Sequence, residues 1–200
     1  MEGLVRTVVG DIKNEGLGIT LMHEHLFIVG EDVDPSDRLD EVEIIIEEMK
    51  DFSNSGGKTI VELSSIGVGA IEWRGMWAEK LVSIAQKSNI NVIAGTGFYC
   101  RNRYGPGEPV FPEIVGRLNA DKLADFYVKE LTSGIQGTGI KAGIIGEIPS
   151  SHNEMHPFVE KNFRAAARAH LKTGAAISTH TSRGTMALEQ LDIFEEEGVA

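Results

Sequence analysis

The chain has 200 residues, of which 42% are hydrophobic and 24% are charged, and its formal net charge at pH 7 is -11. A chain of this size can bury one sizeable core, so a single domain over residues 1–200 is expected. The acidic charge repels nucleic-acid phosphates and anionic lipid headgroups, so neither is expected as a partner.

Cysteine content and the N-terminus bear on the compartment. The only cysteine, Cys100, has no partner for an internal disulfide, which excludes a disulfide-stapled secreted scaffold. The N-terminus lacks a basic segment followed by an apolar run, and no later stretch has the roughly 20 apolar residues of a membrane span. A cytoplasmic protein is therefore expected.

Five strand-helix units follow one another along the chain. Short β-branched runs predict strands, and apolar residues recurring every three or four positions predict helices. After a short strand and turn over residues 4–12, strands are expected at residues 18–23, 59–63, 91–99, 141–148 and 175–180, and helices at residues 38–52, 72–88, 121–131, 157–172 and 185–197. The alternation predicts a parallel sheet with covering helices. Either an open doubly wound sheet or an incomplete (β/α)8 barrel fits this order.

Two histidines stand at the end of the first of these strands. His23 and His25 are two residues apart, so on a strand both imidazoles face the same side and can reach one metal ion. The same pattern also occurs where histidines are hydrogen-bonded structural residues, so the pair needs support from other ligands.

That support comes from the fourth and fifth strands, which end near Glu147 and His180. Carboxyl ends of parallel strands form the edge where active sites collect. Taken singly, Glu147 could be a carboxylate neutralised by Lys141, and His180 a hydrogen-bonded core histidine. Together, three imidazoles and a carboxylate suit a divalent ion or an ion pair. Their convergence favours the barrel, because an open sheet spreads these strands along its width.

The motifs that carry these residues resemble a known family. The segment GITLMHEHL at residues 18–26 is similar to the first-strand signature of the phosphotriesterase family, within the amidohydrolase-like metal-dependent hydrolases. Similar segments follow in the family's order: RTVVGD at 6–11, GTGFY at 95–99, KAGIIGEI at 141–148 and ISTHT at 177–181. The resemblance implies a TIM barrel of metal-dependent hydrolase type, of which the chain holds about the first five β/α units.

The resemblance also implies a ligand set. His23 and His25 would hold the more buried of two divalent ions, and His180 the more exposed one. Many members bridge the ions with a carboxylated lysine on the fourth strand. This chain has Glu147 and no lysine there, which is similar to a subgroup bridged by glutamate and makes efficient phosphotriester turnover doubtful. Zinc is the first expectation, with manganese or cobalt as alternatives.

The reaction implied is attack of a metal-bridging hydroxide on an ester, lactone or phosphoester of a small molecule. Tyr99 would form a wall of the substrate pocket. The family's metal-binding histidine on strand six and proton-handling aspartate on strand eight would lie beyond Ala200, so no catalytic residue is assigned within the chain. We accordingly expect a C-terminally truncated protein with little or no activity alone, and association into homo-oligomers through exposed sheet edges.

Two alternatives remain open from the sequence. Gly146, Glu147 and Ile148 also resemble the fourth-strand motif of metal-dependent deoxyribonucleases built on the same barrel, although the acidic charge speaks against them. A non-enzymatic, five-stranded open α/β binding domain with merely structural histidines is the other alternative.

Overall fold

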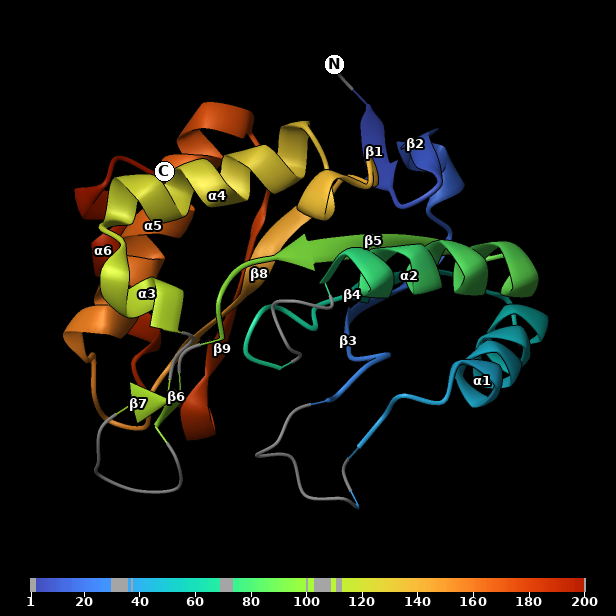
Figure 1. Ribbon diagram of the computed structural model, residues 1–200, viewed down its shortest axis with the longest axis horizontal. Coiled ribbons are helices and arrows are strands. Elements are labelled where there is room, and N and C mark those ends of the chain that lie inside the picture. The colour runs from blue at the N-terminus through green and yellow to red at the C-terminus, as the bar shows by residue number, and fades with distance from the viewer. Residues whose placement is uncertain are drawn as a thin grey trace. The chain divides into compact units, whose positions relative to one another are not determined.

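The computed structural model describes residues 3–29, 36, 38–68, 74–99, 101–102, 109–110 and 113–199 (Figure 1). The chain divides into two compact units. The first unit comprises residues 1–64, 68–95 and 130–143, and the second comprises residues 65–67, 96–129 and 144–200. The expectation of one domain stays a prediction.

The first unit begins with a hairpin and continues with parallel strands and helices. Its elements are β1 (Leu4–Thr7), β2 (Gly10–Lys13), the 3-10 turn η1 (Asn14–Gly16), β3 (Ile19–Glu24), α1 (Val42–Asn54), β4 (Gly57–Glu62), α2 (Arg74–Ser88), β5 (Asn91–Thr96, of which Thr96 belongs to the second unit) and η4 (Ile135–Gly137). Strands β3, β4 and β5 are parallel neighbours in this order. Helices α1 and α2 pack against each other, and α1 also contacts β4.

Burial explains why the first unit forms. Strand β4 is buried at every position except Lys58, and its Ile60 and Val61 are at most 1% exposed, as expected for a parallel strand covered on both faces. From α2, Leu81 and Ile84 are fully buried. Burying apolar side chains of this size contributes about 1.5 to 3 kcal/mol each.

The second unit is built around two parallel strands. Its elements are β6 (Arg101–Asn102), β7 (Pro109–Val110), α3 (Glu113–Arg117), α4 (Ala120–Thr132, of which the last three residues belong to the first unit), β8 (Ile144–Ser150), α5 (Pro157–Thr173), β9 (Ile177–Thr181), η5 (Ser182–Gly184) and α6 (Ala187–Glu196). Strand β8 is buried along its whole length and pairs in parallel with β9. Helix α5 packs on β8 and on α6. Its C-terminus is capped by Gly174 at φ 72°, a left-handed conformation that glycine adopts without a steric penalty.

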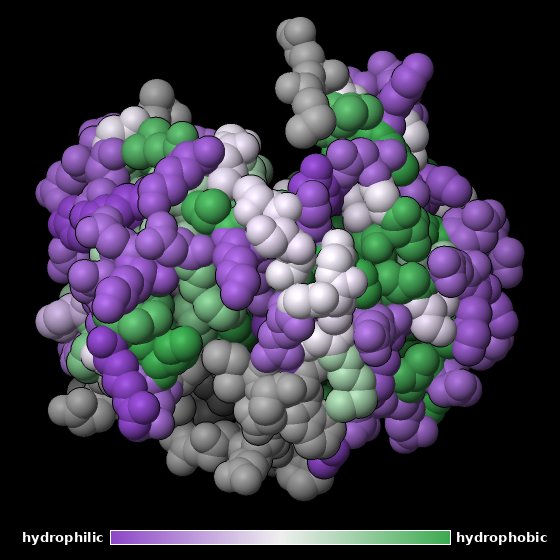
Figure 2. Space-filling model, turned by 45° about the horizontal axis from the view of Figure 1, so that its top comes forward, coloured by the Kyte–Doolittle hydropathy of each residue, from purple (hydrophilic) through white to green (hydrophobic). Residues whose placement is uncertain are grey.

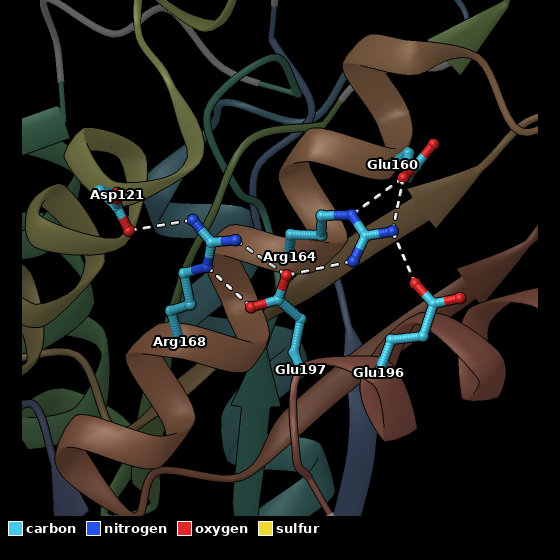
Figure 3. Close-up of polar contacts among 6 residues, drawn as sticks. All are labelled: Asp121, Glu160, Arg164, Arg168, Glu196 and Glu197. Carbon is cyan, nitrogen blue, oxygen red and sulfur yellow. Dashed lines mark hydrogen bonds and ion pairs between the residues drawn. The ribbon is translucent and has the colours of Figure 1, made fainter.

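Ion pairs join the surface of α5 to the end of α6 (Figure 3). Arg164 contacts Glu160, Glu196 and Glu197, while Arg168 contacts Glu197 at 2.7 Å. Hydrogen bonds from both arginines, with that from Arg168 the larger effect, hold the pKa of Glu197 below its ordinary value. The acidic residues Glu196 and Glu197 at the end of α6 therefore form ion pairs with arginines of α5.

The element order agrees with the sequence, but some boundaries differ. Helix α1 begins at Val42 instead of residue 38, because Leu39 forms an antiparallel bridge with Ile28. The strand expected over residues 91–99 ends at Thr96, and the strand expected over 141–148 lies at Ile144–Ser150. Helix α3 and the short β6–β7 pair were not predicted. The start of the helix expected at residues 72–88 and Cys100 lie outside the described residues.

None of the helices that the structure describes is long and apolar enough to cross a membrane. Apolar side chains nevertheless reach the surface, and Figure 2 shows hydrophobic patches between hydrophilic ones on the face it presents. The exposed apolar residues of β3 are Ile19, Leu21 and Met22, and those of α6 are Leu188 and Leu191.

Candidate metal centre

The first unit brings His23 and His25 together at the end of β3. Their ring centroids are 5.4 Å apart and the rings meet edge to face. The pairing of β3 with β4 is irregular here, since three steps on β3, from Leu21 to Glu24, match two steps on β4. An extra residue of this kind redirects side chains, and such bulges occur beside active sites. The expected pair is thus present, but on an irregular strand end.

Beside His25 lies a buried polar cluster that the sequence reading missed. Glu62, which is 0% exposed, accepts hydrogen bonds from the backbone N–H of Leu26 at 3.1 Å and of Ser64 at 3.3 Å. The Ser64 hydroxyl lies 3.3 Å from Nδ1 of His25. The sequence contained a signal for this cluster. Glu62 and Ser64 are polar residues at the end of the second expected strand, on the same sheet edge as His25.

Burial governs the electrostatics of Glu62. Removal from water raises the pKa of this carboxyl, while hydrogen bonding with Ser64, the charge of His25 and the backbone N–H of Leu26 oppose the rise. The carboxylate is therefore held in place by donors that satisfy its oxygens.

The second unit brings Glu147 and His180 together from neighbouring strands. Nδ1 of His180 is 3.2 Å from Oε2 of Glu147, and the Glu147 side chain is only 3% exposed. Glu147 lies within β8, three residues before its end, and not at the strand end as expected. Gly146 allows this arrangement, because a Cβ there would stand 2.5 Å from the carbonyl oxygen of Ser178 on β9.

The side chain of Gln190 fixes the end of β9 that carries His180. Its Nε2 donates a hydrogen bond to the backbone carbonyl oxygen of His180 at 3.0 Å and another to the hydroxyl of Ser150 at 2.8 Å. Gln190 is buried and belongs to α6. Helix α6 therefore holds the imidazole-bearing strand against β8.

Tyr99 lies beside His180, with ring centroids 5.9 Å apart in an edge-to-face arrangement. It follows β5 by three residues, and its N–H donates to the carbonyl oxygen of Ile66 at 2.6 Å. The aromatic ring is thus near one expected ligand, as a wall of a substrate site would be.

Within the first unit, Lys141 acts electrostatically on Asp11, whose pKa is lowered mainly by its hydrogen bond to Arg6 and secondarily by the charges of Arg6 and Lys141. Neutralisation of Glu147 by Lys141 stays an untested alternative. His180 is not a core histidine, since 36% of its side chain is exposed.

The comparison with known proteins identifies the class. The phosphotriesterase family profile matches residues 3–200, so the chain belongs to the phosphotriesterase family. Its members include metal-dependent hydrolases, and the imidazoles and the carboxylate described above are donor types that divalent ions accept.

Several individual relatives and solved structures are similar to this chain. The chain is 39% identical over 184 residues to the phosphotriesterase homology protein of Escherichia coli, covering 91% of this chain and 59% of that protein. A crystal structure of the E. coli protein, complexed with phosphate in its active site, aligns with a TM-score of 0.78 at 38% identity over 92% of this chain and 60% of that one. A lactonase from Listeria monocytogenes aligns with a TM-score of 0.83 at 32% identity over 97% of this chain and 61% of that one. An aryldialkylphosphatase of Saccharolobus solfataricus is 34% identical over 94% of this chain and 57% of that protein.

These matches decide the architecture. The chain has the fold of a partial (β/α)8 barrel, as predicted, and the open doubly wound alternative is wrong. It spans about 60% of the length of the relatives it matches, 59% of the E. coli protein among them.

Proposed function

We propose that the chain carries part of the binuclear metal centre of a phosphotriesterase-family hydrolase. Its ligands would be His23, His25 and Glu147, which form a candidate metal group, together with His180 beside Glu147. The observation that carries the proposal is the pair of Glu147 and His180, two family-motif residues on different strands whose side chains meet at 3.2 Å. The His23–His25 pair on β3 supplies the other imidazoles. Zinc is the first candidate, with manganese or cobalt as alternatives.

Each proposed ligand has a distinct task. The imidazoles offer neutral nitrogen donors, while the buried Glu147 carboxylate offers negative charge that would balance a cation away from water. When bound, divalent ions acidify a water molecule and polarise the C=O or P=O bond of a substrate. Tyr99 would orient the substrate beside His180. We assign no proton acceptor among these 200 residues.

The proposed substrate is a small molecule with an ester, lactone or phosphoester bond. Support comes from the names of the relatives, which include a lactonase and an aryldialkylphosphatase. The family assignment does not support the deoxyribonuclease or the non-enzymatic alternative. We further propose that the 200-residue chain alone hydrolyses such substrates poorly, and turnover near that of an intact relative would contradict this part.

Metal titration tests the centre directly. Chelator-stripped chain is titrated with Co²⁺ and followed by visible absorption, which reports both binding and stoichiometry. We expect wild type to bind, and His25→Ala and His180→Ala each to weaken binding by more than the roughly 10- to 100-fold typical of outer-shell changes.

His152→Ala is the matched control, because His152 is exposed in the loop after β8 and is not a proposed ligand. Its affinity should equal that of wild type. The proposed centre would be contradicted if the wild type and all three variants bound Co²⁺ with equal affinity, or if the folded wild type did not bind Co²⁺. A stoichiometry of one would reduce the binuclear proposal to a single ion.

A further inference from the structure

The contacts around His25 bear on which of its ring nitrogens carries the proton. Nδ1 of His25 is 3.3 Å from the Ser64 hydroxyl oxygen. That hydroxyl donates to the carbonyl oxygen of Phe27 at 2.6 Å. Phe27 follows His25 by two residues, so Ser64 contacts both the ring and the backbone of one segment.

A serine hydroxyl has one proton to donate, and its oxygen can also accept. The Phe27 carbonyl can only accept, so the serine proton is engaged there. The other polar neighbour of this hydroxyl is the carboxyl group of Glu62, which as a carboxylate would compete with the Phe27 carbonyl for the same proton and would likewise act as an acceptor. Ser64 can therefore interact with the imidazole only by accepting, which places a proton on Nδ1 of His25.

A neutral imidazole with its proton on Nδ1 has its lone pair on Nε2. Metal ions bind the nitrogen that carries the lone pair, and outer-shell partners commonly fix this choice. The contact with Ser64 thus selects Nε2 as the nitrogen available to a cation.

Glu62 holds the two segments in register. Its two carboxylate oxygens receive the N–H groups of Leu26 and Ser64, the residue after His25 and the residue that contacts its ring. The carboxylate is fully buried, so these contacts do not compete with bulk water. One side chain therefore fixes the distance between the histidine and its serine partner.

We propose that Ser64 is a positioning residue for His25, accepting its Nδ1–H and presenting Nε2 to the metal, with Glu62 holding both segments in place. This inference deepens the proposed metal centre and rests on it. It assigns roles to Glu62 at the end of β4 and to Ser64 just after it, two residues that the family motifs quoted above do not include.

The tautomer can be read without any metal. Long-range ¹H–¹⁵N NMR of the metal-free chain, labelled at histidine and held near pH 8, distinguishes Nδ1–H from Nε2–H rings, and His25→Gln identifies the signal. We expect Nδ1–H in wild type and a shift toward Nε2–H in Ser64→Ala. Ser64→Thr keeps the hydroxyl and should restore the wild-type tautomer.

Metal affinity provides the second measurement. Ser64→Ala should weaken Co²⁺ binding about 10- to 100-fold. The matched control is Ser88→Ala, which removes another buried serine hydroxyl, one that donates to the carbonyl oxygen of Ile84 in α2. It should leave the tautomer and the affinity unchanged. Circular dichroism checks folding, and Ser64→Cys replaces Ser64→Ala if the alanine variant is unfolded.

The outcomes separate this inference from the proposed function. An unchanged His25 tautomer in the folded Ser64 variant overturns the positioning role, whatever the metal affinity. A shifted tautomer with lower affinity supports it. If the tautomer shifts in the Ser64 variant but the wild-type chain binds no metal, the Ser64 contact is supported, while the proposed metal centre fails.

Discussion

Two fully or nearly buried carboxylates, Glu62 and Glu147, lie beside half-exposed imidazoles in this protein. They differ in their partners. Glu62 receives backbone N–H groups from two segments, whereas Glu147 meets the ring of His180. A carboxylate satisfied by backbone donors stabilises the fold around it, and a carboxylate facing an imidazole can exchange that partner for a cation. We therefore expect loss of Glu62 to lower stability.

The test at this scale is Glu62→Gln. An amide has one acceptor oxygen, so its NH2 group would face the N–H of either Leu26 or Ser64 and leave that donor unsatisfied. We expect the free energy of unfolding, measured by urea denaturation at pH 7, to fall by about 1 to 3 kcal/mol.

Glu24→Gln is the matched control, because Glu24 is a partly exposed glutamate at the end of β3. Its effect should stay within about 0.5 kcal/mol, as for most surface changes. Equal stability of the Glu62 and Glu24 variants would show that the hydrogen bonds to Glu62 contribute little.

At the scale of elements, the end of α6 depends on charge contacts with α5 (Figure 3). Glu197 is 12% exposed in its side chain and receives hydrogen bonds from both Arg164 and Arg168. Helix α6 also supplies Gln190, which holds the strand that carries His180. The ion pairs therefore support the candidate site indirectly.

Replacing this carboxylate tests the contact. Glu197→Gln should lower the free energy of unfolding at pH 7 by about 1 to 2 kcal/mol, between the values of an exposed ion pair and a charged hydrogen bond. Glu195→Gln makes the same charge change at an exposed position of α6 and should have a smaller effect. Chemical denaturation of the three proteins provides the comparison.

The pH dependence has a defined sign. The arginines lower the pKa of Glu197 in the folded chain below the ordinary glutamate value of 4.5. The contribution of the Glu197 carboxylate to the free energy of unfolding is complete above pH 4.5. It is lost as the pH falls through the pKa of the folded state, because the unfolded chain binds the proton more readily. The difference in the free energy of unfolding between wild type and Glu197→Gln should thus be constant from pH 6 to 8 and shrink below about pH 4.5. A difference that grows as the pH falls would exclude the pairing of Glu197 with the arginines.

At the scale of the whole molecule, we expect the exposed apolar side chains on β3 to promote self-association. Ile19 and Met22 are 64% and 63% exposed on a strand whose described neighbour within the first unit is β4 alone. Exposed apolar strand edges pair readily with other chains. The double change Ile19→Thr and Met22→Thr keeps the chain extended but polar, and should raise the monomer fraction in light scattering after size exclusion.

Ile44→Thr is the control for that experiment, since Ile44 is an exposed apolar residue on α1, not on a strand edge. It should leave the mass distribution unchanged. A wild-type chain that is monomeric across the tested concentrations would contradict association through β3.

The amino-acid sequence by itself determined the order of strands and helices, because the period of apolar residues depends on local geometry. It also placed His23, His25, Glu147 and His180 near strand ends, and its motifs predicted the family that the comparison shows. The boundaries near Val42 and Glu147 could not be predicted, since they depend on a bridge to Ile28 and on pairing with β9.

Only the tertiary structure decided which side chains meet. His25 and Ser64 are 39 residues apart, and their contact depends on an irregular register between β3 and β4. A shift of one residue in a strand reverses the direction of every side chain that follows, and no local pattern in the sequence marks such a shift. The sequence therefore supplied the candidate ligands, whereas packing between distant segments decided how His25 and His180 are held.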